Sequence, residues 1–450
     1  MTDMTVFSSP QRTSRATGES DVRIEARQTR DTVGRRACAF VFIENLPHLA
    51  EVYGQDFASA ASRELHRRLC AHFVVSPSSD LARLRDDCFL VWSNQAFDCS
   101  DFDDRAPGEP PRFSERSSGP IEMLLTVAGA EPVCAGNASA LLRLHADWID
   151  VCSPEQLGTS EIELMLWTAQ PYPDSRELRA DGWRQLYQAD MDVALRVSEA
   201  LLADALSFTW QSVAHPGGLA SVLYFSGRVR LAAGIGKTTS LVPEVFMPCL
   251  RRLGLTRAFD RAVIRQALAA LRSRPSIHIG VSISAQSIQL DHWWASLLVI
   301  LDREPALASR LVVEIVDCAA MSDLETARDF CTQLQLRGCR IAIRDLGGGA
   351  DNLAAVQVCG PDIVILDATL VRRARDSDFG RNCLRGMLAM CADFAQHVVV
   401  NGIEREADAD IAERAGARWL QSHDLRGAER QVMSVASAHS NAGSYAEAAP

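Results

Sequence analysis

The sequence predicts an α/β protein in which a closed (β/α) barrel follows a smaller N-terminal α/β domain. The length of 450 residues suits two domains, and the hydrophobic content of 47% is ordinary for a chain with a large core. Strand-like and helical segments alternate through the second half, which indicates βαβ units and a parallel sheet. Because the alternation extends over about 240 residues, it favours a closed barrel over an open sheet.

The composition excludes several classes of protein. A formal net charge of −11 argues against a general nucleic-acid binder, which needs a basic surface. No run of about 18 apolar residues is present, and the polar start carries no secretory signal, so we expect a cytoplasmic protein without a membrane span. The 13 cysteines are scattered without a CxxC pair, and we expect reduced thiols.

The N-terminal domain combines strand and helix patterns. The apolar run at 37–46 predicts a buried strand, and apolar residues at helical spacing predict a helix over 57–73. Two short apolar runs around a polar turn in 81–92 predict a hairpin. After a loop rich in Pro, Gly and Ser, the stretch 121–131 predicts another strand.

The second domain begins with a helical pattern over 191–206, which is followed by strand-like segments at 207–215 and 220–231. Five more strand-like segments then alternate with helical stretches: 277–284, 311–317, 339–345, 362–367 and 397–402. The predicted organisation is a disordered tail at 1–35, a first domain at 36–165, a linker at 166–187, a barrel at 188–432 and a disordered tail at 433–450.

Polar residues gather where the barrel strands are predicted to end, which is where (β/α) barrels place their active sites. They are Ser226 to Arg230, Ser282, Glu314, Asp317, Arg344, Asp345, Asp367, and Asn401 to Glu404. Carboxylates at several strand ends suit an oxygen-ligand site for Mg²⁺ or Mn²⁺. The alternative is that single acids at strand ends cap helices or solvate loops, and the pattern alone leaves both readings open.

Ordered landmarks extend through the second half: WQSV (210–213), PEVFMP (243–248), VEIVD (313–317), RDLGGG (344–349), PDIVILD (361–367), NGIE (401–404) and Gln421. They match Y-Q-P-I, P-x-x-F-I-P, L-E-I-T-E, D-D-F-G-T-G, P-D-x-x-K-I-D, E-G-V-E and a late Q-G. This half resembles an EAL domain, the cyclic-di-GMP phosphodiesterase family, across about residues 188–430. The resemblance implies a modified TIM barrel with an antiparallel first strand.

The first half resembles, on fewer residues, a GGDEF domain of the diguanylate cyclase family. AFVFIENLPHLAEVYGQ (39–55) parallels D-x-D-x-F-K-x-x-N-D-x-Y-G-H, and RLRDDCF (83–89) stands where the family carries R-x-G-G-D-E-F. GGDEF followed by EAL is a familiar domain order.

The resemblance places the metal ligands of an active EAL domain at Ser226, Ser282, Glu314, Arg344 and Asp345. Only Glu314 and Asp345 keep a ligand side chain, and Arg344 puts a fixed cation where a divalent metal would bind. We therefore expect no metal and no hydrolase activity, with Mg²⁺ or Mn²⁺ relevant only to a residual activity.

Two further EAL positions are replaced. The family's Lys corresponds to Ile365 and its late Glu to Asn401. Lys237, the only lysine in the chain, does not align with the missing one. In the GGDEF-like half, Phe42 and Ala50 replace the metal Asp and the guanine-contacting Asn, so no cyclase activity is expected either. The glycine pair of that motif corresponds to Arg85 and Asp86, and its Glu to Cys88.

Five residues remain candidates for binding a ligand, namely Gln211, Arg230, Asp367, Glu404 and Gln421. Gln211 and Arg230 match family positions that contact guanine and phosphate, although Arg230 could equally be a surface arginine. Asp367 and Glu404 could anchor loops beside the site. Glu314 and Asp345 could persist as caps or as ion-pair partners of Arg344 or Arg230.

The leading functional hypothesis is a noncatalytic GGDEF–EAL protein that acts as a regulatory adaptor through an unidentified protein partner. The alternative is a receptor that binds cyclic-di-GMP without metal, and a third, weaker hypothesis is residual phosphodiesterase activity. EAL domains commonly pair through the loop and helix after D-D-F-G, which suggests a homodimer, although the loop LGGGADN (346–352) departs from the family there.

Overall fold

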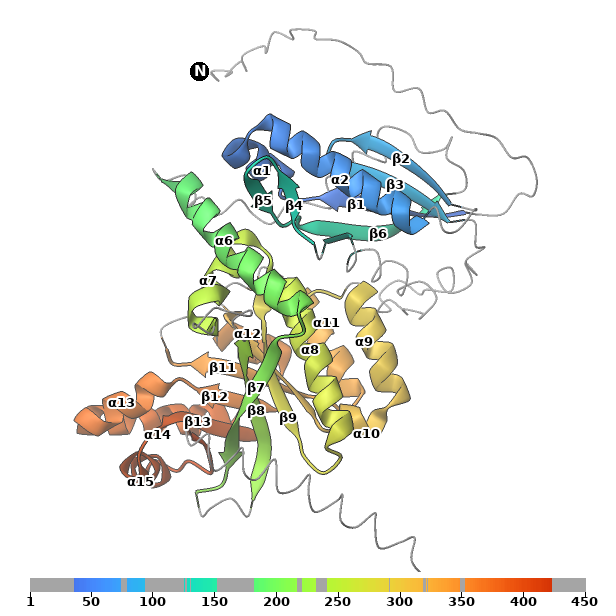
Figure 1. The fold of residues 1–450 in the computed structure, drawn as a ribbon. Helices are drawn as coiled ribbons and strands as arrows, with labels where there is room; N and C mark the ends of the chain where they lie inside the picture. Colours follow the sequence, from blue (N-terminus) through green and yellow to red (C-terminus); the bar gives the residue numbers. More distant parts are fainter. Residues whose placement is uncertain are drawn as a thin grey trace, which may run out of the picture. The chain divides into compact units, whose positions relative to one another are not determined.

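The computed structural model describes residues 36–73, 79–93, 125, 128–129, 131–151, 182–216, 221–231, 241–290, 292–318, 321, 323–348 and 353–422 (Figure 1). All of them belong to one compact unit, Arg35–Pro450. The tails predicted at 1–35 and 433–450 lie outside the described residues, as does most of the predicted linker.

The N-terminal half contains a four-stranded sheet in the order β2-β3-β1-β6. Its strands are β1 (Arg36–Ile43), β2 (Ser79–Arg85), β3 (Cys88–Ser93) and β6 (Leu144–Val151), and every pairing is antiparallel. The hairpin expected at 81–92 is present as β2 and β3. One face is apolar because alternate residues of β1, Ala39, Val41 and Ile43, are buried in the core.

Helices α1 (Leu46–Tyr53) and α2 (Gln55–Phe73) pack with this sheet. Leu65 and Leu69 of α2 are fully buried, as their helical spacing predicts. The strand predicted at 121–131 is wrong where the structure describes it, because Leu125, Ala128 and Gly129 are helical. Leu125 and Ala128, three residues apart, both face the core, and a short apolar run does not distinguish a strand from a buried helix.

The sequence analysis missed helix α1, whose first residue is the last of the strand predicted at 37–46, and it missed the strands β4 (Val133–Ala135), β5 (Ala138–Ala140) and β6. Strand β6 pairs along the whole length of β1. A small hairpin, β4 and β5, forms a separate two-stranded sheet.

Helix α6 (Trp183–Leu202) precedes the barrel and starts earlier than the predicted 191. Its Tyr187 stacks on His48 with ring centroids 5.9 Å apart, and the sulfur of Met191 accepts a hydrogen bond of 3.4 Å from the Leu141 N–H. On the barrel side, Asp190 is bonded to Arg252. The helix is therefore fixed against the elements before and after it.

The predicted closed barrel is confirmed, with eight strands in the order β10-β11-β12-β13-β14-β7-β8-β9. The strands are β7 (Leu206–Ala214), β8 (Val222–Leu231), β9 (Ile279–Ser284), β10 (Leu311–Val316), β11 (Arg340–Leu346), β12 (Ile363–Leu366), β13 (His397–Ile403) and β14 (Trp419–Ser422). Strand β7 is antiparallel to both of its neighbours, β8 and β14, as the resemblance implies. Strand β14 was not predicted, since four residues are too few to show a period.

Helices lie outside the barrel strands (Figure 1). They are α7 (Pro243–Leu253), α8 (Thr256–Ser273), α9 (His292–Arg303), α10 (Pro305–Ala308), α11 (Leu324–Leu336), α12 (Leu353–Cys359), α13 (Ala368–Asp376), α14 (Asp378–Ala392) and α15 (Glu406–Arg414), with a short 3₁₀ turn at Ala285–Ser287. Among the described residues, no helix is both long and apolar enough to cross a bilayer.

Side chains fill the barrel below the strand ends. Tyr224, Val312, Ala342, Ile365 and their neighbours form one buried cluster inside the strands. A Cβ atom on Gly280 would lie 2.4 Å from the Tyr224 ring, so only glycine leaves room for that ring. This packing closes the floor beneath the polar residues described next.

Candidate functional site

Four strands of the barrel bring the central polar residues together. Glu314 of β10 stands in register with Ser282 of β9, and Ser226 of β8 pairs with the neighbouring Gly280. Arg344 comes from β11, the strand on the other side of β10. The Arg344 Nη1 donates a 2.5 Å hydrogen bond to Glu314 Oε2, and the Ser282 hydroxyl donates to the same oxygen at 2.8 Å.

The Glu314–Arg344 contact is a buried ion pair, with side chains 0% and 4% exposed. Burial acts to raise the pKa of Glu314, but the charge and hydrogen bond of Arg344, with the hydrogen bond from Ser282, hold that pKa below its usual range. Burial acts to lower the pKa of Arg344, whereas the carboxylates of Glu314 and Asp345 raise it overall. Both partners are therefore charged at neutral pH.

Three buried polar atoms beside the ion pair have no hydrogen-bond partner among the described residues. They are Glu314 Oε1 and the hydroxyls of Ser226 and Tyr224. Burial, and then the charge of Glu314, raise the pKa of Tyr224, so its phenol is protonated. Ser226 and Ser282 thus supply neutral hydroxyls at positions where the family resemblance expects metal ligands.

The residues present do not fit a divalent cation. A magnesium or manganese ion needs several oxygen ligands in one place, and within the described ranges no three His, Cys, Asp or Glu side chains form such a group. Of the two acids kept from the family pattern, Glu314 already bonds the Arg344 guanidinium. A metal there would have to displace that guanidinium or lie against its positive charge.

Asp345, the residue before the last one of β11, has an unusual backbone conformation, with φ of 60°. Non-glycine residues seldom adopt this left-handed region, although aspartate tolerates it better than most. Burial raises the pKa of Asp345 despite the neighbouring Arg344. Asp317, the residue after β10, has the same φ of 60° and forms an ion pair with Arg251.

A second group gathers on the antiparallel side of the barrel. The Gln211 Oε1 accepts hydrogen bonds from Arg228 Nε at 3.2 Å and from Gln421 Nε2 at 3.1 Å. Both glutamines are buried, 3% and 1% exposed. The two terminal nitrogens of Arg228 make no hydrogen bond to any described residue. Burial and the neighbouring Arg344 lower the pKa of Arg228, which stays a cation because the ordinary value is so high.

The sequence analysis included Arg228 only within the range Ser226 to Arg230 and gave it no role of its own. The pattern that could have identified it is the alternation of side chains along a strand, which places Ser226, Arg228 and Arg230 on one face of β8. Arg230 is exposed, and its side chain makes no hydrogen bond or ion pair with any residue in the described part of the chain. Its proposed contact with a ligand stays a prediction.

The other candidate residues from the sequence form hydrogen bonds with residues near them in the fold. Asp367 begins α13 as its N-cap, accepting a 2.7 Å hydrogen bond from the Thr369 N–H. Asn401 is buried and accepts from the Gly402 N–H. Glu404 bonds Arg375 at 3.1 Å. The structure thus groups Gln211 with Gln421, but it gives Asp367 and Glu404 separate local partners.

The model of one protein family, described as the EAL domain, matches residues 194–421, just over half of the chain. The chain belongs to the EAL domain family. An uncharacterized protein of Mycobacterium tuberculosis is 27% identical over 242 residues, which cover 52% of this chain and 35% of that protein. A cyclic di-GMP phosphodiesterase of Escherichia coli, PdeF, is 22% identical over 193 residues, covering 42% and 26%. The chain therefore spans about a third or less of the length of these curated relatives.

Solved structures that contain an EAL domain align with this chain. The EAL enzyme Bd1971, in a form with cAMP and cyclic-di-GMP bound, aligns with a TM-score of 0.50 at 16% identity, covering 66% of this chain and 81% of that one. The S helix–GGDEF–EAL part of Vibrio cholerae LapD aligns with a TM-score of 0.47 at 15% identity, covering 87% and 89%. The eight-stranded EAL barrel, with its reversed strand β7, is the frame that carries Glu314 and Arg344.

Proposed function

We propose that this EAL protein is catalytically inactive and acts as a regulatory adaptor in cyclic-di-GMP signalling through contacts with another protein. The observation that carries the proposal is the ion pair between Arg344 and Glu314. EAL hydrolysis resembles a two-metal reaction, in which metals generate hydroxide and stabilise the displacement. Here the surviving carboxylate is bonded to a guanidinium, and hydroxyl groups stand at Ser226 and Ser282.

The N-terminal half supports the same proposal as a degenerate GGDEF-like domain. Where the family has its glycine pair, this chain has Arg85, the last residue of β2, and Asp86, the first residue of the turn to β3. Arg85 bonds Asp87 at 2.9 Å, and Arg83 bonds Asp86 at 2.6 Å. These side chains fill the turn that glycines would leave open for a nucleotide.

Catalysis is tested by incubating the purified chain with cyclic-di-GMP and Mg²⁺ or Mn²⁺, and by measuring linear pGpG by chromatography. We expect no product above a protein-free control. Metal-dependent pGpG formation that disappears in the Glu314→Gln variant would overturn the proposal. The adaptor role is tested by affinity capture with the full chain as bait, with each partner confirmed by the reciprocal capture. A strain that lacks the protein provides the second test, and the absence of both a partner and a deletion phenotype would count against the adaptor role.

A cyclic-di-GMP receptor without metal is the second candidate, and Arg228 favours it. Arg228 bonds the buried Gln211 through Nε alone, and it lies on the same face of β8 as Arg230. A guanidinium with free donors is suited to bind a phosphate oxygen. Calorimetry with micromolar cyclic-di-GMP, in Mg²⁺ and again in EDTA, tests this candidate. Equal binding in both buffers, abolished by Arg230→Ala, would support it, and the absence of heat would exclude it.

A further inference from the structure

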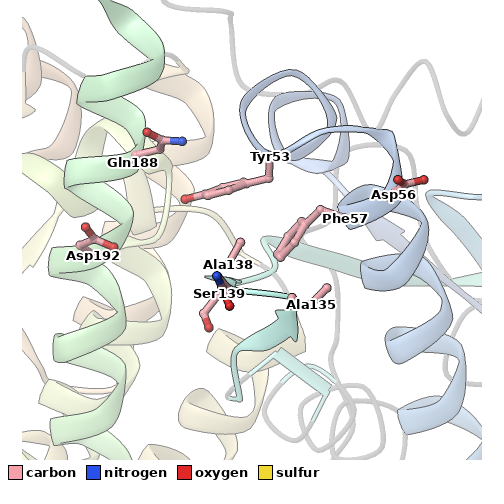
Figure 2. Close-up of a pocket in the computed structure, with 10 residues that line it drawn as sticks. Tyr53, Asp56, Phe57, Ala135, Ala138, Ser139, Gln188 and Asp192 are labelled. Atoms are coloured by element: carbon pink, nitrogen blue, oxygen red, sulfur yellow. The ribbon is translucent and has the colours of Figure 1, made fainter.

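A cleft of about 590 Å³ lies in the N-terminal half, away from the polar residues of the barrel (Figure 2). It is bordered by the junction of α1 and α2, by the β4–β5 hairpin and by one side of α6. A volume of this order is typical of small-molecule sites.

Two aromatic rings form one wall of the cleft. Tyr53 ends α1 and Phe57 lies in the first turn of α2, with ring centroids 5.0 Å apart and planes tilted by 37°. Figure 2 shows both side chains directed into the cleft, with the Tyr53 ring extending toward α6. The faces of aromatic rings carry partial negative charge and attract cations.

The opposite wall carries an unpaired carboxylate. Asp192 of α6 lines the cleft, and among the described residues it makes no ion pair, not even with Arg196 one helical turn later. Two residues earlier on the same helix, Asp190 is held by two hydrogen bonds of 2.7 Å from Arg252. Burial, and then the charge of Asp192, raise the pKa of Tyr53 to about 12, which agrees with a carboxylate directed at the cleft.

Asp56, in the first turn of α2, is a second carboxylate of the lining, and the other polar groups are neutral. The hairpin contributes Asn137 and Ser139, and α6 contributes Gln188. No arginine, lysine or histidine is among the described residues that line the cleft. An anion would meet the two carboxylates of Asp56 and Asp192 without a balancing charge. Two acids are too few for a divalent metal, and no metal-binding group of three or more His, Cys, Asp or Glu is found among the described residues.

The walls are fixed before any ligand arrives. The stacking of Tyr187 on His48 and the bond from Leu141 to Met191 hold α6 against the N-terminal half. A ligand therefore need not pay to order the helix that carries Asp192, which favours binding by a small molecule.

We propose that this cleft binds a small organic cation, with its protonated amine or guanidinium group between Asp192 and the faces of Tyr53 and Phe57. The site is independent of the proposed role of the barrel. The cation could be a free amine or a basic side chain presented on a peptide, since the two share one chemistry.

Calorimetry on the full chain tests the proposal with putrescine and agmatine as free cations, 1,4-butanediol as an uncharged analogue of putrescine, and a short arginine-containing peptide. We expect saturable binding of at least one cation and none of the diol. Preference for agmatine or putrescine would identify a free amine, whereas preference for the peptide would identify a side chain.

Variants distinguish binding in the cleft from general attraction of cations by the negatively charged chain. Asp192→Asn should weaken cation binding at least tenfold and Tyr53→Leu several-fold, whereas Tyr53→Phe keeps the ring and should bind normally. Asp329→Asn removes the same charge from an exposed position of α11 and should not change cation binding. Binding of no cation at millimolar concentration, or equal losses in Asp192→Asn and Asp329→Asn with unchanged melting temperatures, would overturn the proposal.

Discussion

Arg252 of α7 holds the carboxylate of Asp190 in α6 with two hydrogen bonds of 2.7 Å, one to each oxygen. The Asp190 side chain is 4% exposed and that of Arg252 39%. The pair therefore joins the helix before the barrel to the first helix of the barrel, with the acid on the buried side.

Replacing Arg252 by alanine should destabilise the protein, because it leaves the Asp190 carboxylate buried without its partner. We expect a loss of about 1–3 kcal/mol in the free energy of unfolding, measured by urea denaturation. Arg265→Ala, which removes an exposed arginine from α8, is the control and should change stability by less than about 0.5 kcal/mol. Equal effects of the two substitutions would show that the pair contributes nothing.

Breaking the Glu314–Arg344 pair should lower the free energy of unfolding more than replacing Arg252 does. Arg344→Met leaves a fully buried carboxylate without its counter-ion, and we expect about 3–5 kcal/mol of destabilisation. The double variant Glu314→Gln/Arg344→Met, which removes both charges, should recover part of that loss. A double variant as unstable as the single one would show that packing, rather than charge, accounts for the effect.

The same pair predicts a dependence of stability on acid. Because the pKa of Glu314 is lowered in the folded protein, its contribution is complete above the pKa of an unfolded glutamate. The contribution is lost as the pH falls through the lower folded value. Acid titration of unfolding should therefore show a smaller loss for Glu314→Gln than for the natural chain, and parallel curves would contradict this.

Asp260 predicts the opposite dependence of folding stability on pH. It is buried in α8, accepts hydrogen bonds from the Ser287 hydroxyl at 2.5 Å and the Ser284 N–H at 3.0 Å, and burial raises its pKa from 3.8 to about 7. The folded protein therefore keeps a proton that the unfolded chain has released, and stability falls as pH rises between these values. The loss amounts to at most about 1.4 kcal/mol per pH unit. Asp260→Asn should flatten the difference in unfolding free energy between pH 5 and 7, and an unchanged slope would refute the assignment.

Gly280 should be irreplaceable by alanine. The added Cβ would lie 2.4 Å from the Tyr224 ring and 2.9 Å from Glu314 Oε1, and we expect at least about 1–3 kcal/mol of destabilisation from overpacking. Gly386→Ala is a matched control, because its Cβ would meet no atom within 4 Å and it lies inside α14. There alanine should stabilise the helix by about 0.5–1 kcal/mol, and thermal unfolding of both variants distinguishes the cases.

The barrel could be predicted because its strands are buried on both faces and appear as continuous apolar runs. In β10, for example, Val312, Val313 and Ile315 are all buried. What the sequence could not predict is which side chains of neighbouring strands bond to one another. Sequence analysis left open whether Glu314 would pair with Arg344 or Arg230, and only the neighbouring strands β10 and β11 decide for Arg344.

Other features carried too little signal for sequence reasoning. The hydrogen bond from Arg228 to Gln211 joins residues 17 positions apart on antiparallel strands. The cleft at Tyr53 and Asp192 joins α1 and α6, which are distant in sequence, so no local pattern marks it.

The direction of β7 determines where the preceding chain enters the barrel. Leu206, the first residue of β7, pairs with Leu231, the last residue of β8, and β8 runs parallel to β9. The entry point therefore lies at the rim where the parallel strands end, on the same side as Arg228 and Arg344. A parallel first strand would put the entry at the opposite end. For protein engineering, a domain fused ahead of α6 would be connected to the mouth of the barrel through that helix of 20 residues, on the side where Arg228 and Arg344 lie.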